Sequence, residues 1–183
     1  GGLVGSAIRE VSGLYKDFDI LFSTRADCNL LDQDSVQHML DMTRPDAVIH
    51  TAARVGGIGM NLSTPGQQFY ENIMMNTMII HYSYMYGVNN LISFSSVCAF
   101  PNGAEVLSED ILHDGQPHPA HRSYAYSKRM VDIQIEAYNK QNGLNYCSVI
   151  PGNIFGKRDN FNLDHGHVIP SLIHKCYIAK KNN

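Results

Sequence analysis

The sequence lacks several features that would assign it to particular classes of protein. It has no apolar run of membrane-spanning length, no signal peptide, no Cys-x-x-Cys pair among its four cysteines, and no basic run before Lys180-Lys181. These absences argue against a membrane-embedded protein, a disulfide-rich secreted domain and a protein that binds nucleic acid or anionic membranes. Widely spaced cysteines are simplest to interpret as those of a reducing, cytosolic compartment.

Metal-ligand spacing, internal repeats and linkers are also absent. None of the nine histidines falls in a His-x-x-x-His or Cys/His cluster, so we expect no metal site. The formal net charge is only −3, so any recognition of phosphate must be local. With 183 residues, 44% of them hydrophobic and 17% charged, the chain has the composition of one globular domain.

Strand signals and helix signals alternate along the chain. Periodicity predicts helices over about 5–14, 35–43, 65–86 and 123–142, and buried strands over 19–22, 46–50, 91–96 and 146–150. This order favours a Rossmann-like, doubly wound parallel sheet with right-handed crossovers and helices on both faces. In such sheets ligands bind at the carboxyl ends of the strands, where Ser96 lies.

A Tyr-x-x-x-Lys motif, Tyr124 and Lys128, lies on the last of these predicted helices. Residues four apart share a helical face, so we expect the Lys128 ammonium to lie beside the Tyr124 phenol and to lower its pKa. The phenol could then act as an acid or base near neutrality, while Ser96 holds the oxygen of a carbonyl or alcohol substrate. Taken alone, so short a motif is more often part of an ordinary amphipathic helix.

The first residues, Gly1 to Ile8, have the pattern of the second half of a glycine-rich phosphate turn that runs into a helix. Gly2 and Gly5 have the three-residue spacing of such a turn, whose backbone approaches a pyrophosphate at a helix N-terminus. No hydrophobic strand precedes them in the sequence. We therefore expect the sequence to begin inside the motif.

Together with His50–Ala53 and Asn72, these motifs resemble the extended short-chain dehydrogenase/reductase family. Further blocks resemble its GDP-L-fucose synthase branch, in that branch's order and spacing. The blocks are Ala53–Ile58, Ser96–Pro101, Pro151–Gly156, Asp159–Phe161 and Gly166–Pro170. The resemblance covers nearly the whole chain.

This resemblance implies an activity: NADPH-dependent 3,5-epimerisation and 4-reduction of GDP-4-keto-6-deoxy-D-mannose to GDP-L-fucose. Two proton carriers besides Tyr124 are needed for that reaction. Cys98 matches the branch's catalytic cysteine and His167 its catalytic histidine, beside Ser96, Tyr124 and Lys128. Without the resemblance, a buried thiol and an isolated histidine would more often be structural.

Related enzyme classes fit less well. The sugar-nucleotide dehydratases follow their catalytic Ser or Thr directly with Asp-Glu, and Val97-Cys98 occupies those positions here. A 4-epimerase of the UDP-galactose type would leave Cys98 and His167 without a role. Two alternatives stay open: a reductase or epimerase of another nucleotide sugar, and a non-catalytic NADP-sensing protein.

The resemblance also implies cofactor and substrate contacts. Arg25 follows the strand predicted over 19–22, where an arginine favours the 2′-phosphate of NADP(H); alternatively, it is a solvated loop charge near Asp27. The implied cofactor-binding residues are Gly2, Gly5, Arg25, Asn29, Leu30, Ala52, Ala53, Asn72, Phe94, Ser95, Ser96, Val97, Tyr124, Lys128, Pro151, Gly152, Asn153, Ile154 and His167. The implied substrate-binding residues are Ser96, Cys98, Asn153, His167 and Lys175.

Chains of this branch continue past Asn183 into a smaller substrate-binding domain. We therefore expect residues 1–183 to be an NADP-binding Rossmann-like domain that is incomplete at the N-terminus, with 157–183 leading into a mostly missing region.

The chain also departs from the branch at three positions. Gly152 replaces a usual Thr, Lys157 a usual Pro and Val97 a usual small hydroxyl residue. The branch's long helices often form a homodimer, which a stripe of methionines at 74, 75, 78 and 85 could serve, although such stripes are more often core.

Overall fold

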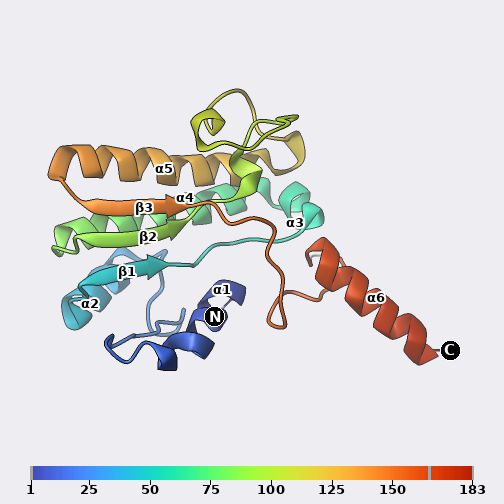
Figure 1. The fold of residues 1–183 in the computed structure, drawn as a ribbon, viewed down its shortest axis with the longest axis horizontal. Helices are drawn as coiled ribbons and strands as arrows, with labels where there is room; N and C mark the ends of the chain where they lie inside the picture. Colours follow the sequence, from blue (N-terminus) through green and yellow to red (C-terminus); the bar gives the residue numbers. More distant parts are fainter. Residues whose placement is uncertain (1, 165, 183) are drawn as a thin grey trace.

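A parallel three-stranded sheet organises the protein, whose computed structural model describes residues 2–164 and 166–182 (Figure 1). The strands β1 (Ala47–His50), β2 (Asn90–Phe94) and β3 (Asn145–Val149) are hydrogen-bonded in the order β1-β2-β3. Both neighbouring pairs are parallel, and helices connect successive strands. The Rossmann-like α/β class predicted from the sequence is confirmed.

The two faces of the sheet differ in exposure because alternate side chains of a strand point to opposite sides. Leu91 and Tyr146 lie opposite one another in the register and are 1% and 4% exposed. Ile49 and Ile92 also lie opposite one another, but they are 50% and 37% exposed. Among the described residues, the main core therefore lies on the Leu91 side.

Three helices cover that buried side. The helices α4 (Pro65–Met85) and α5 (Arg122–Asn142) pack along each other, and α2 (Gln33–Thr43) packs on α4. All three lie close to their predicted ranges because their ends carry strong local signals. The Asp32 carboxylate caps α2 by accepting from the amides of Asp34 and Ser35, and Gly143 ends α5 in the left-handed conformation with φ 66°.

The main core joins these helices to the sheet. Its fully enclosed side chains include Val36 and Leu40 of α2, Ile80 of α4 and Val131 of α5, each with 0% exposure. Of the methionine stripe, Met78 packs against this core, whereas Met85 is 61% exposed.

The N-terminal segment differs in part from the prediction. The helix predicted over 5–14 is α1 (Leu3–Val11) followed by a short 3₁₀ helix, η1 (Ser12–Leu14). The strand predicted over 19–22 is wrong, because these residues are extended or irregular and pair with no strand in the described chain. An apolar run becomes a strand only where another backbone lies alongside it, and here β1 pairs with β2 alone.

Short helices follow the carboxyl ends of the strands. They are α3 (Ile58–Ser63) after β1, and η2 (Val97–Ala99), η3 (Glu109–Ile111) and η4 (Pro119–His121) between β2 and α5. A second, smaller core of Ala99, Phe100 and Leu112 holds the η2–η4 connection together.

The last helix, α6 (Val168–Asn182), lies beyond the carboxyl ends of the strands in Figure 1, at the end of a long connection from β3. Pro170 and Ser171 are its buried residues, whereas Leu172 and Ile173 are about half exposed, at 53% and 50%. Across the described residues, we find no helix with the length and apolar character needed to cross a membrane.

Candidate active site

The turn that follows β2 brings a hydroxyl and a thiol together. Ser96 is the N-cap of η2, and its Oγ accepts a hydrogen bond from the amide of Cys98 at 3.2 Å. The hydroxyl and the thiol are thus parts of one tight turn at the carboxyl end of a strand. The turn is preceded by Phe94 and Ser95 and includes Val97. The buried Ser95 hydroxyl has no hydrogen-bond partner in the described protein.

The helix α5 carries Tyr124 and Lys128 to the same place. Lys128 is 2% exposed, its Nζ donates to the carbonyl oxygen of Phe94 at 2.7 Å, and it lies 5.9 Å from the Tyr124 ring centroid. A hydrogen bond between Tyr124 and Ser96 and the proximity of Cys98 both act on the phenol's pKa. Ser96, Cys98, Tyr124 and Lys128 therefore form one cluster.

Burial dominates the protonation of this cluster. It raises the pKa of Tyr124 to about 12, against the lowering effect of the Ser96 hydrogen bond, and it lowers the pKa of Lys128 to about 8. The prediction that Lys128 lowers the phenol's pKa is therefore wrong for this arrangement, because lost hydration outweighs any attraction and the ammonium is turned to a backbone carbonyl. A phenol that stays protonated at neutral pH suits the role of proton donor.

Buried polar side chains lie behind Lys128. The His50 Nε2 and Asn76 Oδ1 atoms are 2.9 Å apart, which assigns the hydrogen to Nε2 because Oδ1 can only accept. Burial and then the charge of Lys128 lower the pKa of His50 to about 4, so it is neutral at pH 7. The sequence analysis did not single out Asn76 or a structural role for His50.

Arg129 is another residue that the sequence analysis missed. It is 5% exposed, and its guanidinium donates to the carbonyl oxygens of Ala99 at 2.7 Å and Gly115 at 2.8 Å. It thereby fixes η2, which carries Cys98, to α5. A sequence signal existed, since Arg129 lies four residues after the buried Ala125 and thus on the inward face of the helix.

His167 lies outside this cluster of contacts. Its Nδ1 lies 3.1 Å from Asp159 Oδ1, and the Asp159 side chain is 4% exposed with Oδ2 unpartnered in the described protein. The structure shows no hydrogen bond from His167 to Ser96, Cys98 or Tyr124 within the described ranges. Lys175 is exposed in the middle of α6.

The predicted dinucleotide edge lies at the start of α1. Gly2 is its N-cap, and a Cβ on Gly5 would lie 3.2 Å from the Thr51 hydroxyl, so this glycine permits a close approach of α1 to the residue after β1. Arg25 is exposed in a turn where the Asp27 carboxylate accepts from the amide and hydroxyl of Thr24. That bonding lowers the pKa of Asp27.

Side chains of α4 hold the loop after β1, which contains Ala52 and Ala53. Asn72 is 0% exposed, and its side chain accepts from the Arg54 amide at 2.9 Å and donates to the Arg54 carbonyl oxygen at 3.0 Å. The Arg54 guanidinium also pairs with Glu71 at 3.0 Å. Asn72 therefore positions the backbone of this loop.

The other predicted cofactor residues lie on two further loops. The amide of Asn29, which Leu30 follows, donates to the Ser35 hydroxyl at 2.9 Å near the start of α2. Pro151 is half-buried after β3, and residues 152–154 beyond it are exposed.

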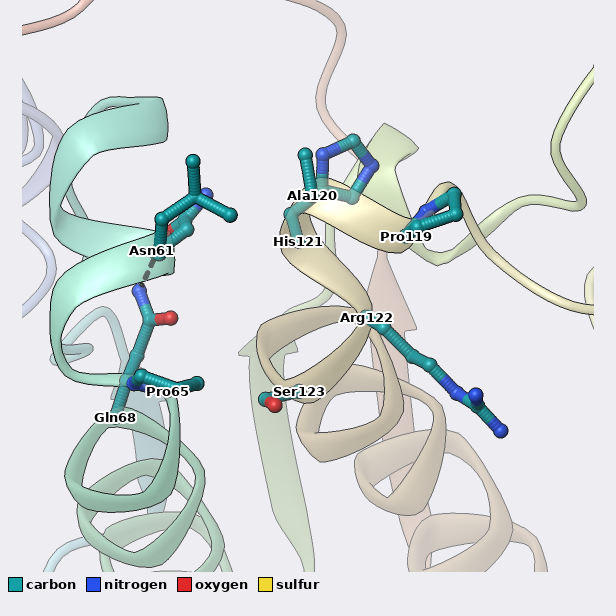
Figure 2. A pocket seen from close by; sticks show the side chains of 9 residues that line it. Asn61, Pro65, Gln68, Pro119, Ala120, His121, Arg122 and Ser123 are labelled. Atoms are coloured by element: carbon teal, nitrogen blue, oxygen red, sulfur yellow. Dashed lines mark hydrogen bonds between the residues drawn. The ribbon is translucent and has the colours of Figure 1, made fainter.

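A cavity of about 170 Å³ lies between the start of α4 and the turn before α5 (Figure 2). Gln68 and Asn61 line one side, and His121 and Ser123 line the other. Ser123 directly precedes Tyr124 in the sequence, but the residues that line this cavity do not include Ser96, Cys98, Tyr124 or Lys128. The described residues contain no group of three or more His, Cys, Asp or Glu side chains that could hold a metal ion.

Comparison with known proteins places this geometry in a family. The GDP-L-fucose synthase of Dictyostelium discoideum is 41% identical over 185 residues, covering 100% of this chain and 58% of the relative. The GDP-L-fucose synthase of Escherichia coli K12 is 37% identical, covering 100% of this chain and 57% of the relative.

Among solved structures, a GDP-L-fucose synthetase from Naegleria fowleri bound to NADP superposes with a TM-score of 0.90 at 38% identity. The match covers 99% of this chain and 56% of that one, so the chain spans a little over half the length of the relatives it matches. The sequence model of the NAD dependent epimerase/dehydratase family matches residues 2–182. The chain therefore belongs to the NAD dependent epimerase/dehydratase family.

Proposed function

We propose that the protein is an NADPH-dependent 3,5-epimerase and 4-reductase that converts GDP-4-keto-6-deoxy-D-mannose to GDP-L-fucose. The observation that carries the proposal is the single turn that holds the Ser96 hydroxyl and the Cys98 thiol beside Tyr124. A reductase alone needs no thiol at this place. The similarity to GDP-L-fucose synthases over the whole length of the chain supports the choice of substrate.

The chain's residues fit NADP(H). The exposed Arg25 guanidinium can meet a 2′-phosphate, because the nearby Asp27 carboxylate is already bonded to Thr24. The Gly2–Gly5 backbone can approach the pyrophosphate at the start of α1. The Ser95 hydroxyl, which has no hydrogen-bond partner among the described residues, lies within the predicted nicotinamide-side segment 94–97. When bound, the cofactor supplies the hydride for the 4-keto carbon.

In the reduction, the protonated Tyr124 phenol gives its proton to the C4 oxygen, and the Ser96 hydroxyl holds that oxygen by hydrogen bonding. The raised pKa of Tyr124, about 12, keeps this proton in place until the oxygen becomes strongly basic. The Lys128 ammonium, held on the Phe94 carbonyl, supplies positive charge beneath the site.

In the epimerisations, Cys98 and His167 exchange protons at C3 and C5, the carbons beside the C4 carbonyl. One group removes the proton, the C–H electron pair moves to the C4 oxygen as an enolate, and the other group returns a proton on the opposite face. Ser96 and Tyr124 stabilise the enolate oxygen by hydrogen bonds. Asp159 orients the His167 ring through Nδ1, which leaves Nε2 for proton transfer.

For substrate binding, we assign Asn153 and Ser96 to the sugar and the exposed Lys175 to the diphosphate.

For assembly, we propose a homodimer through α4 and α5, supported by the exposed Phe69, Met130 and Ile133, at 40%, 47% and 43%. Two helices from each copy would bury these side chains. The free thiols of Cys28 and Cys98 accord with a reducing cytosol, which we propose as the location.

The test is exchange of solvent deuterium into GDP-4-keto-6-deoxymannose by the full-length protein, with product identification after NADPH is added. We expect deuterium at C3 and C5 and a fucose-configured product from the unaltered protein. Cys98→Ser and His167→Gln should suppress exchange by more than about 100-fold while NADPH affinity stays within twofold. Exposed Cys176→Ser is the matched control for thiol loss.

Unchanged exchange in both variants would remove the roles assigned to Cys98 and His167. NADPH oxidation without a fucose-configured product would reduce the assignment to a reductase of another keto-sugar. Lack of any turnover in the unaltered protein would favour the NADP-sensing alternative.

A further inference from the structure

A carboxylate on the first helix holds two cations from the connection that follows β3. Glu10, near the end of α1, pairs through Oε2 with Lys157 Nζ at 3.0 Å and through Oε1 with Arg158 Nε at 3.1 Å. Glu10 and Arg158 are 148 positions apart in the sequence. Hydrogen bonds from Lys157 and then Arg158 lower the pKa of the Glu10 carboxyl, so it is ionised at neutral pH. We call Glu10, Lys157 and Arg158 the ionic clamp.

The same two segments also pack against each other beside the ionic clamp. A Cβ on Gly156 would lie 3.1 Å from Leu3 Cδ1, so the lack of a side chain at 156 lets the first turn of α1 approach the connection after β3. Leu3 and Glu10 are about two helical turns apart and so share a face of α1. Figure 1 shows this connection passing α1 on its way to α6. The helix therefore meets the connection at both of its ends.

The two cations directly precede the residues that hold His167. Asp159 follows Arg158, and its Oδ1 lies 3.1 Å from His167 Nδ1. The loop between them is tied to the first turns of α6, because Ser171 Oγ donates to the Asn162 carbonyl oxygen at 2.9 Å. A shift of residues 157 and 158 would therefore move His167 and the start of α6 with it.

The other side of the ionic clamp belongs to the predicted cofactor edge. The helix α1 begins at the Gly2–Gly5 turn, which is predicted to meet the pyrophosphate of NADP(H). We propose that Glu10 is a positioning residue that fixes the segment carrying His167 to the helix that meets the cofactor. This inference rests on the function proposed above. Since Lys157 replaces a usual Pro, its pair with Glu10 is a feature of this chain and not a general one of the branch.

The position of the ionic clamp makes it adjustable. All three side chains are exposed, Lys157 most of all, and exposed ion pairs are individually weak and screened by salt. A dinucleotide bound at the start of α1 restrains that helix, and the clamp passes the restraint on to the His167 segment. Because such coupling is reciprocal, an ordered His167 segment also favours binding of the cofactor.

The test measures amide hydrogen exchange of the full-length protein by mass spectrometry, with and without NADPH. NADPH should slow exchange in residues 158–174, a segment that includes the hydrogen-bonded amides of Gly166 and Ser171. Glu10→Gln keeps the shape of the side chain but removes its charge, and it should weaken this NADPH-dependent protection by about 2- to 5-fold. Glu136→Gln, which removes an exposed carboxylate from α5, is the matched control and should leave the protection unchanged.

Charge reversal gives a second, independent comparison. Glu10→Lys repels both cations and should weaken the protection at least as much as Glu10→Gln. Adding Lys157→Glu and Arg158→Glu to Glu10→Lys re-forms the pairs with opposite signs and should restore the protection to within about twofold. In the unaltered protein, raising NaCl from about 0.05 to 0.5 M should reproduce the effect of Glu10→Gln, because salt screens exposed charges.

Solvent deuterium exchange at C3 and C5 of the keto-sugar connects the ionic clamp to the chemistry, and Glu10→Gln should slow it by about 2- to 5-fold. Unchanged amide protection in Glu10→Gln, or reversed charges that fail to restore it, would overturn the positioning role while the proposed function stands. Absence of deuterium exchange in the unaltered protein would instead overturn the proposed function, and with it the role of Glu10 toward His167.

Discussion

The guanidinium of Arg129 donates a hydrogen bond to the carbonyl oxygen of Ala99, the residue after Cys98, at 2.7 Å. This bond joins α5, which carries Tyr124 and Lys128, to the turn that carries Ser96 and the thiol. Because Arg129 is 5% exposed, the bond lies away from competing water. The relative position of the proton donor and the thiol therefore depends on a residue that touches neither.

Replacing Arg129 should weaken both the fold and the site. Arg129→Met leaves the carbonyl oxygens of Ala99 and Gly115 without their donors, so we expect a loss of about 2–4 kcal/mol in the free energy of unfolding measured with urea. The rate of Cys98 alkylation should rise because η2 loosens. Arg122→Met is the control, since Arg122 stacks on the same Tyr126 ring but is exposed. Equal unfolding curves for the two variants would contradict this role.

Tyr124→Phe should separate the two halves of the proposed reaction. It removes the phenolic proton, so NADPH oxidation with the keto-sugar should slow by about 10²- to 10⁴-fold. Deuterium exchange at C3 and C5 should persist at a measurable rate, because Cys98 and His167 would carry those protons. Stopped-flow absorbance and NMR follow the two rates on one sample. A full reduction rate in this variant would rule out Tyr124 as the proton donor.

Arg25→Ala should change the choice of cofactor. Loss of a charge-assisted contact to the 2′-phosphate should raise the Kd for NADPH by about 10- to 100-fold and leave the Kd for NADH within twofold. Fluorescence titration gives both constants. Arg44→Ala removes an exposed arginine that pairs with Asp41 and should alter neither value. Equal weakening for NADH and NADPH would place Arg25 away from the 2′-phosphate.

His50 should make the protein acid-labile. Its pKa falls from 6.5 to about 4 on folding, chiefly by burial, so between these pH values the unfolded chain binds more protons. Stability should therefore decrease as the pH falls from 6.5 to 4, by on the order of 3 kcal/mol from this group. His50→Gln keeps a donor for Asn76 without titrating, and it should flatten the urea-unfolding free energy across that range. His38→Gln, at an exposed position on α2, should retain the slope.

Sequence signals predicted the elements whose ends and periodicity are local. The Asp32 cap, the left-handed Gly143 and the apolar phase of Ile79 and Ile80 each act within a few residues, so α2, α4 and α5 lie close to their predicted ranges. The run at 19–22 was indistinguishable from a strand in sequence. Its conformation depends on a neighbouring backbone, which no local pattern specifies.

The candidate site likewise has features that could be predicted from the sequence and features that could not. The cluster of Ser96, Tyr124 and Lys128 could be predicted, because helix spacing and strand ends determine which side chains meet. The pKa of Tyr124 could not, since it depends on burial by residues from several elements. The structural role of Arg129 was likewise hidden, because its partners are backbone carbonyls brought close only by the fold.

The hydrogen bond from the Cys98 backbone amide to Ser96 Oγ ties the Ser96 hydroxyl to the backbone that carries the thiol. A single inserted or deleted residue between them would break this hydrogen bond and displace the sulfur from the hydroxyl, so both proposed activities would fail in one step. Residues 105–107, a few positions later, are exposed, and this part of the loop should tolerate changes of length. The length of the chain between Ser96 and Cys98 is therefore as restricted as the identity of either residue.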